Sequence, residues 1–328
     1  MKAAFYTQLG SAPEVLTVGE LEKPPVEAGE VRVRIRASGI NPSDVKQRSG
    51  WGGLTMRFDR VIPHNDGAGI IEAVGEGVSI DRIGQRVWIY EATLRGGKGT
   101  AAEFVSVPSE QAVPLPDNTD FASGACLGVP AMTAHYSLFC DGVVNGQTIL
   151  VTGGAGAVGN YAIQLAKWGG ATVITTVSSP EKAEVAQAAG ADRVLNYKTE
   201  DVAAQIKADF PRGVDRVVDV DFAANLAVNL KLLKRNGAIA SYASDSNPQP
   251  QLPFYELAYK NLRVHYVLVY TMNSAAHAAA ARDITAALEA GALKHPIDQR
   301  FSLEEIAKAH ERMESGRAIG NLVIEISE

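Results

Sequence analysis

Cysteine is almost absent from this chain of 328 residues, which contains only Cys126 and Cys140. Two cysteines cannot form the disulfide framework of a small secreted domain or a four-cysteine zinc module. We therefore expect a protein of a reducing compartment, the cytoplasm. There, both thiols would be buried as small apolar side chains and would not serve as ligands or nucleophiles.

Long hydrophobic runs and excess positive charge are missing as well. No apolar run approaches the roughly 18 residues that a membrane-spanning helix needs, and the chain does not begin with a signal-peptide core. Acidic residues outnumber basic ones by 37 to 31, for a formal net charge of -6. This balance disfavours general binding to a nucleic-acid backbone. The six histidines include no H-x-x-x-H pair, and the chain has no G-x-S-x-G turn.

The clearest positive pattern is a glycine-rich turn that follows a short apolar run. Residues 148–152 are apolar or β-branched, and Gly154, Gly156 and Gly159 fit G-x-G-x-x-G before an amphipathic stretch at 160–167. The first glycine allows a tight turn, the second lets the backbone approach a pyrophosphate, and the third permits close helix–strand packing. The intervening Ala155, Ala157 and Val158 complete a predicted dinucleotide-binding loop whose helix directs unpaired N–H groups toward phosphates.

Around this loop the sequence predicts two regions of different character. The first hundred or so residues are β-rich, whereas strands and helices alternate from residue 148 onward, as in a doubly wound parallel sheet. Strands are expected at 31–35, 67–75, 85–90, 103–108, 148–152, 172–177, 193–196, 214–220, 237–242, 261–270 and 322–326. Helices are expected at 121–141, 180–188, 275–290 and 302–315, the last opened by a capping box.

Several motifs together resemble a known family. They are A-S-G-I-N-P-S-D at 37–44, D-G-A-G at 66–69 with E-A-V-G at 72–75, G-V-P-A-M-T-A at 128–134, the glycine loop, and A-H-E at 309–311. They resemble the medium-chain dehydrogenase/reductase superfamily, and within it the zeta-crystallin-like NADPH:quinone oxidoreductases, nearly end to end. Two departures are the His64-Asn65 pair before Asp66 and Asn321, where many members carry lysine.

The resemblance implies an α/β fold in which a Rossmann doubly wound parallel sheet is inserted into a β-rich, GroES-like catalytic domain. Residues 1–123 and 270–328 would form the catalytic domain, and residues 124–269 the NADPH-binding domain. It also implies a homodimer that forms through the strand from Leu262 to Tyr270.

The resemblance also indicates that no metal takes part. Asn41, Asn65 and Val129 stand where zinc-dependent relatives have ligands, and amide and aliphatic side chains are poor zinc ligands. His64 is next to one of these positions and is interpreted as a loop histidine. His310 is expected on a helix surface, in a structural role.

The corner after the second strand of the predicted sheet favours NADPH over NADH. No acidic residue ends the run at 172–177, so the usual ribose-binding carboxylate is missing. Ser178 can donate to a 2′-phosphate, Lys182 can neutralise it, and Ser179 is an expected N-cap. By resemblance, the other cofactor contacts are Asn41, Asp44, Thr133, Ser241, Tyr197 and Arg317.

The predicted reaction is hydride transfer from NADPH to a quinone. Without a Lewis acid, alcohol oxidation lacks its usual stabilisation of an alkoxide, whereas a quinone accepts hydride readily. Asn41, Arg48 and Tyr90 are the candidate catalytic residues, and the proton donor stays open. Two alternatives also stay open: reduction of an α,β-unsaturated carbonyl, and a crystallin-like or nucleic-acid-binding role without catalysis.

Overall fold

The computed structural model describes residues 1–327, which divide into two compact units. The first unit comprises Met1–Pro130 and the C-terminal segment that begins at His295, and the second comprises Ala131–Lys294. Helix α10 (Ser274–Glu289) belongs to the second unit, whereas the sequence interpretation places it in the catalytic domain. One cause is Asp283 of α10, which contacts His135 Nε2 of helix α4 (Gly128–Phe139) at 2.9 Å.

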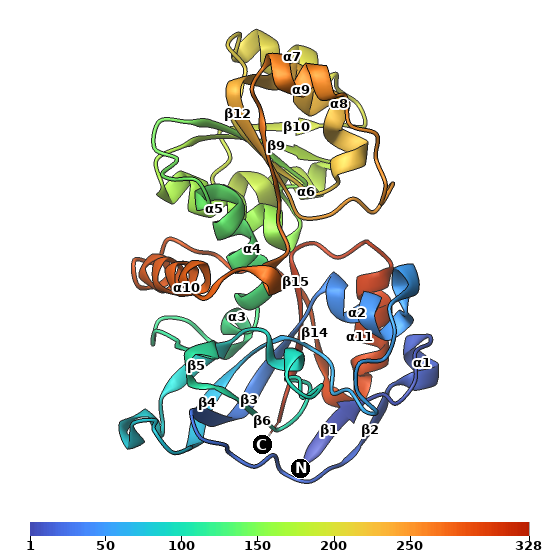
Figure 1. Cartoon of the computed structure of the whole chain (residues 1–328), viewed down its shortest axis with the longest axis vertical. Coiled ribbons are helices and arrows are strands. Elements are labelled where there is room, and N and C mark those ends of the chain that lie inside the picture. The colour runs from blue at the N-terminus through green and yellow to red at the C-terminus, as the bar shows by residue number, and fades with distance from the viewer. Residues whose placement is uncertain (328) are drawn as a thin grey trace. The chain divides into compact units, whose positions relative to one another are not determined.

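A six-stranded parallel sheet organises the second unit, and the predicted doubly wound fold is confirmed. Its strand order is β10-β9-β8-β11-β12-β13, the order typical of dinucleotide-binding sheets. The strands are β8 (Thr148–Thr152), β9 (Thr172–Val177), β10 (Arg193–Asn196), β11 (Val214–Asp219), β12 (Leu233–Ser241) and β13 (Arg263–Tyr266). Figure 1 shows helices beside this sheet, namely α5 (Ala157–Trp168), α6 (Pro180–Ala188), α7 (Val202–Asp209), α8 (Phe222–Leu232) and α9 (Phe254–Tyr259).

The edge strand β13 is shorter than the sequence predicts. A strand was expected across 261–270, but pairing with β12 ends at Tyr266, and Val269–Thr271 form a short 3-10 turn. Exposed and buried side chains still alternate from Tyr266 to Val269, so the strand-like pattern continues beyond the residues that pair. Apolar character alone therefore overestimated the length of the strand.

The first unit has a mixed seven-stranded sheet. Its order is β14-β15-β3-β4-β5-β7, and β6 pairs with β3. The strands are β3 (Glu30–Ile40), β4 (Asp66–Val74), β5 (Arg86–Ile89), β6 (Phe104–Pro108), β7 (Ala112–Pro114), β14 (Ile297–Ser302) and β15 (Asn321–Glu325), with β1 (Lys2–Phe5) and β2 (Thr17–Glu20) in a separate pair. The helices are α1 (Ala12–Val15), α2 (Pro42–Ser49), α3 (Phe121–Gly124) and α11 (Ile306–Glu314).

Strand β3 shows why the sequence pattern produces this sheet. Val31, Val33 and Ile35 are buried in the core, whereas Arg34 between them is exposed, so the alternation of apolar and basic residues separates two faces. β15 pairs antiparallel with β3. The last strand of the chain therefore completes a sheet begun by its first hundred residues.

The register of β3 and β4 creates the polar centre of this unit. Gly39 of β3 pairs with Asp66 of β4, so the residues that follow β3 and those that precede β4 meet at one end of the sheet. A Cβ at Gly39 would lie 2.0 Å from the carbonyl oxygen of Ala125, so glycine is needed for this close approach.

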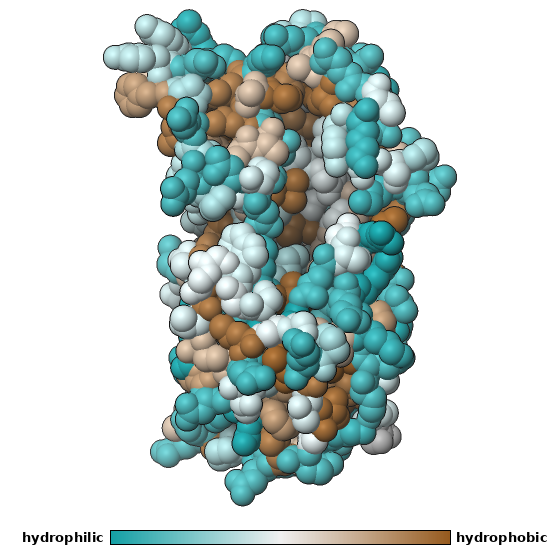
Figure 2. All heavy atoms as spheres, turned by 90° about the vertical axis from the view of Figure 1, so that its right-hand side faces the viewer, coloured by the Kyte–Doolittle hydropathy of each residue, from teal (hydrophilic) through white to brown (hydrophobic). Residues whose placement is uncertain are grey.

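Within residues 1–327, no helix is long and apolar enough to cross a membrane. Figure 2 shows one face of the molecule, where hydrophilic side chains cover much of the surface and hydrophobic ones form separate patches.

Candidate active site

In the first unit, Asn41 is the residue that starts helix α2. It has extended backbone angles, and Pro42 follows at the first helical position. Proline suits this position because an N–H group there would have no partner within the helix. The backbone N–H of Asn41 donates to Asp44 Oδ2 at 2.8 Å. Asp44 also lies in the first helical turn, where the helix dipole favours a carboxylate.

Two amide–carboxyl pairs lie next to this helix start. Asn41 Nδ2 donates to Asp66 Oδ2 at 2.8 Å, and Asn65 Nδ2 donates to Asp44 Oδ1 at 3.0 Å. All four side chains are buried, with Asp66 fully inaccessible. Each amide nitrogen is thus fixed toward a carboxyl group, which determines the orientation of both amides.

Burial changes the ionisation of the two carboxyl groups. It raises the pKa of Asp44 to about 7, and it raises the pKa of Asp66 well above its usual range, with a further contribution from the charge of Asp44. Asp66 Oδ2 also accepts from the backbone N–H of Val129 at 2.8 Å. Because both carboxyls are buried and lie next to each other, the pair tends to keep a proton near neutral pH.

This arrangement does not fit a catalytic zinc ion. The amide nitrogens of Asn41 and Asn65 are directed at carboxyls, and Val129 offers only its backbone N–H to Asp66. Both ring nitrogens of His64 are also occupied, one by Ser38 and one by His310. The thiolate and imidazole ligands that zinc prefers are therefore not available here.

His64 and His310 form a buried chain of hydrogen bonds whose direction can be worked out. Thr100 Oγ1 donates its only proton to the carbonyl of Asp66 at 2.5 Å, so Ser38 Oγ donates to Thr100 Oγ1 at 2.7 Å. Ser38 must then accept from His64 Nδ1–H at 2.8 Å. His64 Nε2 in turn accepts from His310 Nε2–H at 2.9 Å, which leaves His310 Nδ1 as a buried acceptor without a partner.

This chain corrects one expectation from the sequence. His310 was expected on a helix surface but is fully buried, and its ring stacks on His64 with centroids 5.2 Å apart. Burial lowers the pKa of His64 to about 3 and that of His310 well below its usual value, so both rings are neutral. His64 has a left-handed backbone (φ 74°), a strained conformation that these contacts hold beside Asn65 and Asp66.

The other two candidate catalytic residues have partners inside the first unit. The fully buried Arg48 donates to the carbonyl of Gly10 and forms an ion pair with Glu314. The hydroxyl of Tyr90 donates to the carbonyl of Glu110 at 3.4 Å, and burial raises the pKa of Tyr90 to about 12. Catalytic roles for Asn41, Arg48 and Tyr90 stay predictions.

In the second unit, the glycine loop connects β8 to α5 as expected. Gly153 has a left-handed backbone (φ 72°), and Gly156 is the N-cap of α5. Added Cβ atoms at Gly154 and Gly159 would lie 2.1 Å from Thr175 Oγ1 and 2.3 Å from the Gly153 carbonyl oxygen. Those two glycines are therefore required by packing. A Cβ at Gly156 would meet only one atom, at 3.4 Å, so packing leaves that position open.

The predicted phosphate corner is assembled at the ends of β9 and β10. Ser178 directly follows β9, and the backbone N–H of Tyr197 donates to the carbonyl of Val177 at 3.1 Å, which brings Tyr197 to the same edge. Ser179 is the N-cap of α6, and its hydroxyl accepts from the N–H of Lys182 at 3.4 Å. The Lys182 ammonium forms no ion pair within residues 1–327.

The remaining cofactor candidates are in both units. Thr133 is buried in α4. Ser241 ends β12, and its hydroxyl donates to the carbonyl of Ala243 at 3.1 Å. Arg317 is exposed between α11 and β15 in the first unit. Their cofactor contacts stay predictions.

Sequence reasoning missed the carboxyls as partners of the two asparagines, and it missed the histidine chain. The N-P-S-D and H-N-D motifs each contain an amide and a carboxyl. The side-chain hydrogen bonds nevertheless run between the two motifs, from Asn41 to Asp66 and from Asn65 to Asp44, so neither motif alone shows the pairing. No local signal connects His64 to His310, because 246 positions separate them.

The fold and these two sites define the class of nicotinamide-nucleotide-dependent dehydrogenases and reductases. In agreement, a family profile described as "Alcohol dehydrogenase GroES-like domain" matches residues 27–117. A second, described as "Zinc-binding dehydrogenase", matches residues 157–286.

Known proteins resemble the whole chain. "Quinone oxidoreductase" of Rattus norvegicus is 30% identical, covering 99% of this chain and 97% of the relative, and "2-methylene-furan-3-one reductase" of Solanum lycopersicum is 31% identical, covering 99% and 79%. Among solved structures, an NAD-dependent alcohol dehydrogenase has 30% identity and a TM-score of 0.88, with all of both chains covered. Escherichia coli quinone oxidoreductase complexed with NADPH has 26% identity and a TM-score of 0.86, covering 99% of this chain and 100% of its own.

The chain therefore belongs to the medium-chain dehydrogenase/reductase superfamily, in its quinone-oxidoreductase-like group. It is an oxidoreductase whose second unit has the fold that binds NAD(P)-type cofactors.

The loop glycines provide a matched pair of substitutions. Gly159→Ala should lower the free energy of unfolding by about 1–3 kcal/mol, because its Cβ meets backbone atoms that cannot move aside. Gly156→Ala should fold with nearly unchanged stability but bind the nicotinamide nucleotide about 10-fold or more weakly, because its Cβ fills space meant for the pyrophosphate. Urea unfolding and fluorescence titration measure the two effects. Equal destabilisation by both changes would contradict this division of roles.

The histidine chain predicts a loss of stability in acid. Both histidines have a folded-state pKa below the unfolded value near 6.5, so the unfolded state takes up protons first and stability falls as the pH drops from about 6.5 toward 3. At about pH 5 the unfolded chain protonates a histidine whose pKa is near 6.5, and the folded state keeps the ring neutral. Each neutral ring therefore lowers the free energy of unfolding at that pH by roughly 2 kcal/mol, which corresponds to about 1.5 pH units. His310→Gln should therefore lose about 2 kcal/mol less than the wild type between about pH 8 and pH 5 in urea unfolding. The same loss in both proteins would show that the chain does not titrate in this way.

Proposed function

We propose that this protein is an NADPH-dependent reductase that transfers hydride to a quinone without a catalytic metal. The observation that carries the proposal is the commitment of Asn41 and Asn65 to Asp66 and Asp44, at the positions where zinc-dependent relatives have ligands. The similarity to quinone oxidoreductases over nearly the whole chain supports the acceptor class.

In this proposal the protein binds and orients the reactants. When bound, NADPH supplies the hydride. The loop from Gly154 to Gly159 binds the pyrophosphate with backbone N–H groups, and the pairing with Asp66 presents the amide of Asn41 in a single orientation. A quinone suits such a site because its reduced anion is stable and can be protonated by water. No protein acid has to be placed beside the acceptor.

Reduction of an α,β-unsaturated carbonyl is the second candidate. It is favoured by the 31% identity to 2-methylene-furan-3-one reductase over 99% of this chain. That chemistry ends with protonation of an enolate. The buried carboxyls Asp44 and Asp66, which retain protons near neutral pH, are a possible local reservoir.

Steady-state kinetics tests the reaction. After exhaustive dialysis against a chelator, the full-length protein should reduce 1,4-benzoquinone with NADPH at an undiminished rate. With NADP⁺, its oxidation of simple alcohols should be slower than its quinone reduction by on the order of 100-fold or more, because no Lewis acid stabilises the alkoxide. A higher kcat/KM for a cyclic enone than for the quinone would favour the second candidate. Loss of alcohol oxidation on chelation and its recovery with zinc would refute the metal-free mechanism.

We also propose that the cofactor is NADPH, bound through Ser178, Lys182 and Tyr197. Lys182→Glu should raise the KM for NADPH about 10-fold or more, because a charge-assisted contact to the 2′-phosphate becomes a repulsion. The KM for NADH should change less than about twofold. Lys207→Glu, which reverses an exposed charge on α7, is the matched control. Equal effects of Lys182→Glu on both cofactors would show that Lys182 does not contact the phosphate.

The proposal includes a homodimer that forms through the edge of the parallel sheet. It also includes a cytoplasmic location, which the small number of cysteines favours. Strand β13 is the last strand of its sheet, and Tyr266 in this strand and Leu268 two residues beyond it are more than half exposed. Pairing with a second copy would cover this edge. Light scattering that finds only monomers would remove this part of the proposal.

A further inference from the structure

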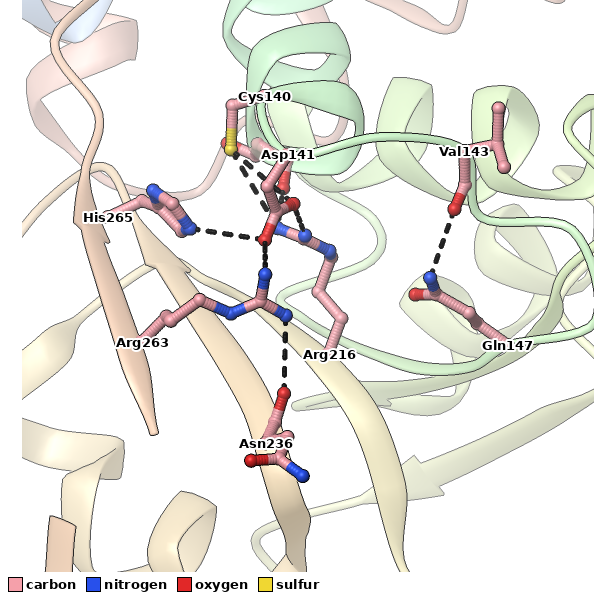
Figure 3. Close-up of polar contacts among 9 residues, drawn as sticks. Cys140, Asp141, Val143, Gln147, Arg216, Asn236, Arg263 and His265 are labelled. Atoms are coloured by element: carbon pink, nitrogen blue, oxygen red, sulfur yellow. Dashed lines mark hydrogen bonds and ion pairs between the residues drawn. The ribbon is translucent and has the colours of Figure 1, made fainter. Parts of the chain in front are cut away.

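Three side chains with metal-binding atoms converge in the second unit. Cys140 and Asp141 follow helix α4, and His265 lies in strand β13. Their sulfur, oxygen and nitrogen ligand atoms all lie within 4.8 Å of one another. Figure 3 shows the three side chains directed toward a common point, with Arg216 and Arg263 beside them. Within residues 1–327 no other three histidine, cysteine or acidic side chains come together in this way.

The spacing of two of these atoms suits a tetrahedral zinc ion. Zinc takes imidazole nitrogen at about 2.0–2.1 Å and carboxylate oxygen at about 2.0–2.2 Å, so two such ligands at a tetrahedral angle lie roughly 3.3–3.5 Å apart. His265 Nε2 and Asp141 Oδ2 are separated by 3.4 Å. The Nε2 atom is buried and has no hydrogen bond. Thiolate, imidazole and carboxylate are also the three ligand types that zinc prefers.

Arg216 has the position of a supporting residue. Its side chain is 3% exposed and forms an ion pair with Asp141 Oδ1, the carboxylate oxygen turned away from His265. Its other terminal nitrogen lies 3.9 Å from Cys140 Sγ. A guanidinium placed in this way fixes the orientation of the Asp141 carboxylate.

Arg263 is the group that competes with a metal. Its guanidinium contacts Asp141 Oδ2 at 2.9 Å, the same oxygen that faces His265, and its side chain is 55% exposed. A cavity of about 150 Å³ adjoins Asp141, Arg216 and Arg263. This space gives the Arg263 side chain room to move away from Asp141.

We propose that Cys140, Asp141 and His265 form a zinc site that is separate from the reaction. Arg216 pairs in register with Ile149 near the start of β8, whereas the glycine loop follows the end of that strand. A zinc ion here would tie the end of α4 to the edge strand β13 and would displace Arg263 from Asp141. Its role is structural, so hydride transfer does not depend on it.

Titration of the metal-free, full-length protein with ZnCl₂ against a chromophoric chelator tests the site. The wild type and Cys126→Ser should bind one zinc ion per chain. The loss of a residue that only supports a ligand weakens metal binding by roughly 10–100-fold. Cys140→Ser and His265→Gln each remove a ligand, so their affinity for zinc should fall by more than that. Cobalt(II) should give a thiolate charge-transfer band that Cys140→Ser lacks. NADPH-dependent quinone reduction at the wild-type rate shows that each variant is folded.

Arg263→Gln gives a result that only this arrangement predicts. Removal of the competing guanidinium should strengthen zinc binding several-fold, whereas a nonspecific surface site would not respond in this direction. Three results would each overturn the proposal: no stoichiometric zinc in the wild type, unchanged affinity in Cys140→Ser and His265→Gln, or weaker binding in Arg263→Gln.

Discussion

The hydrogen bond between the Asn41 amide and the Asp66 carboxyl determines what the first unit can do. It joins the start of α2 to the start of β4, and it is possible because the register of β3 with β4 puts Gly39 opposite Asp66. An amide that donates one N–H to a buried carboxyl keeps its second N–H and its carbonyl oxygen for other partners. The same bond therefore fixes the orientation of the Asn41 amide in the site.

The histidine chain extends this constraint to the end of the sequence. Thr100, Ser38, His64 and His310 form a hydrogen-bonded series with one permitted direction, which begins at the carbonyl of Asp66 and ends on helix α11. His64 keeps a left-handed backbone just before Asn65. Because such strain persists only where surrounding contacts impose it, this series has a physical role in positioning Asn65 and Asp66.

Local patterns were sufficient for much of the fold, and long-range contacts explain most of the rest. Strands β8, β9 and β10 have the predicted bounds, because apolar runs followed by glycine or polar turns are local signals. The length of β13 depends on where β12 stops pairing, and the position of α10 depends on the contact between Asp283 and His135. The glycine loop could be predicted in the same local way. The burial of His310 could not, because it depends on a partner 246 positions away.

The two neighbouring carboxyls and two asparagines of the first unit make a poor zinc site, whereas Cys140, Asp141 and His265 bring a thiol, a carboxylate and an imidazole together in the second unit. The difference lies in which groups neutralise each carboxylate. Asp44 and Asp66 are buried among amides, and burial raises the pKa of both, whereas Asp141 lies between two guanidinium groups. A carboxyl group that arginines contact beside a thiol and an imidazole offers a metal three suitable ligand types, whereas carboxyl groups surrounded by amides do not. The family profile described as "Zinc-binding dehydrogenase" matches residues 157–286, which lie within the second unit.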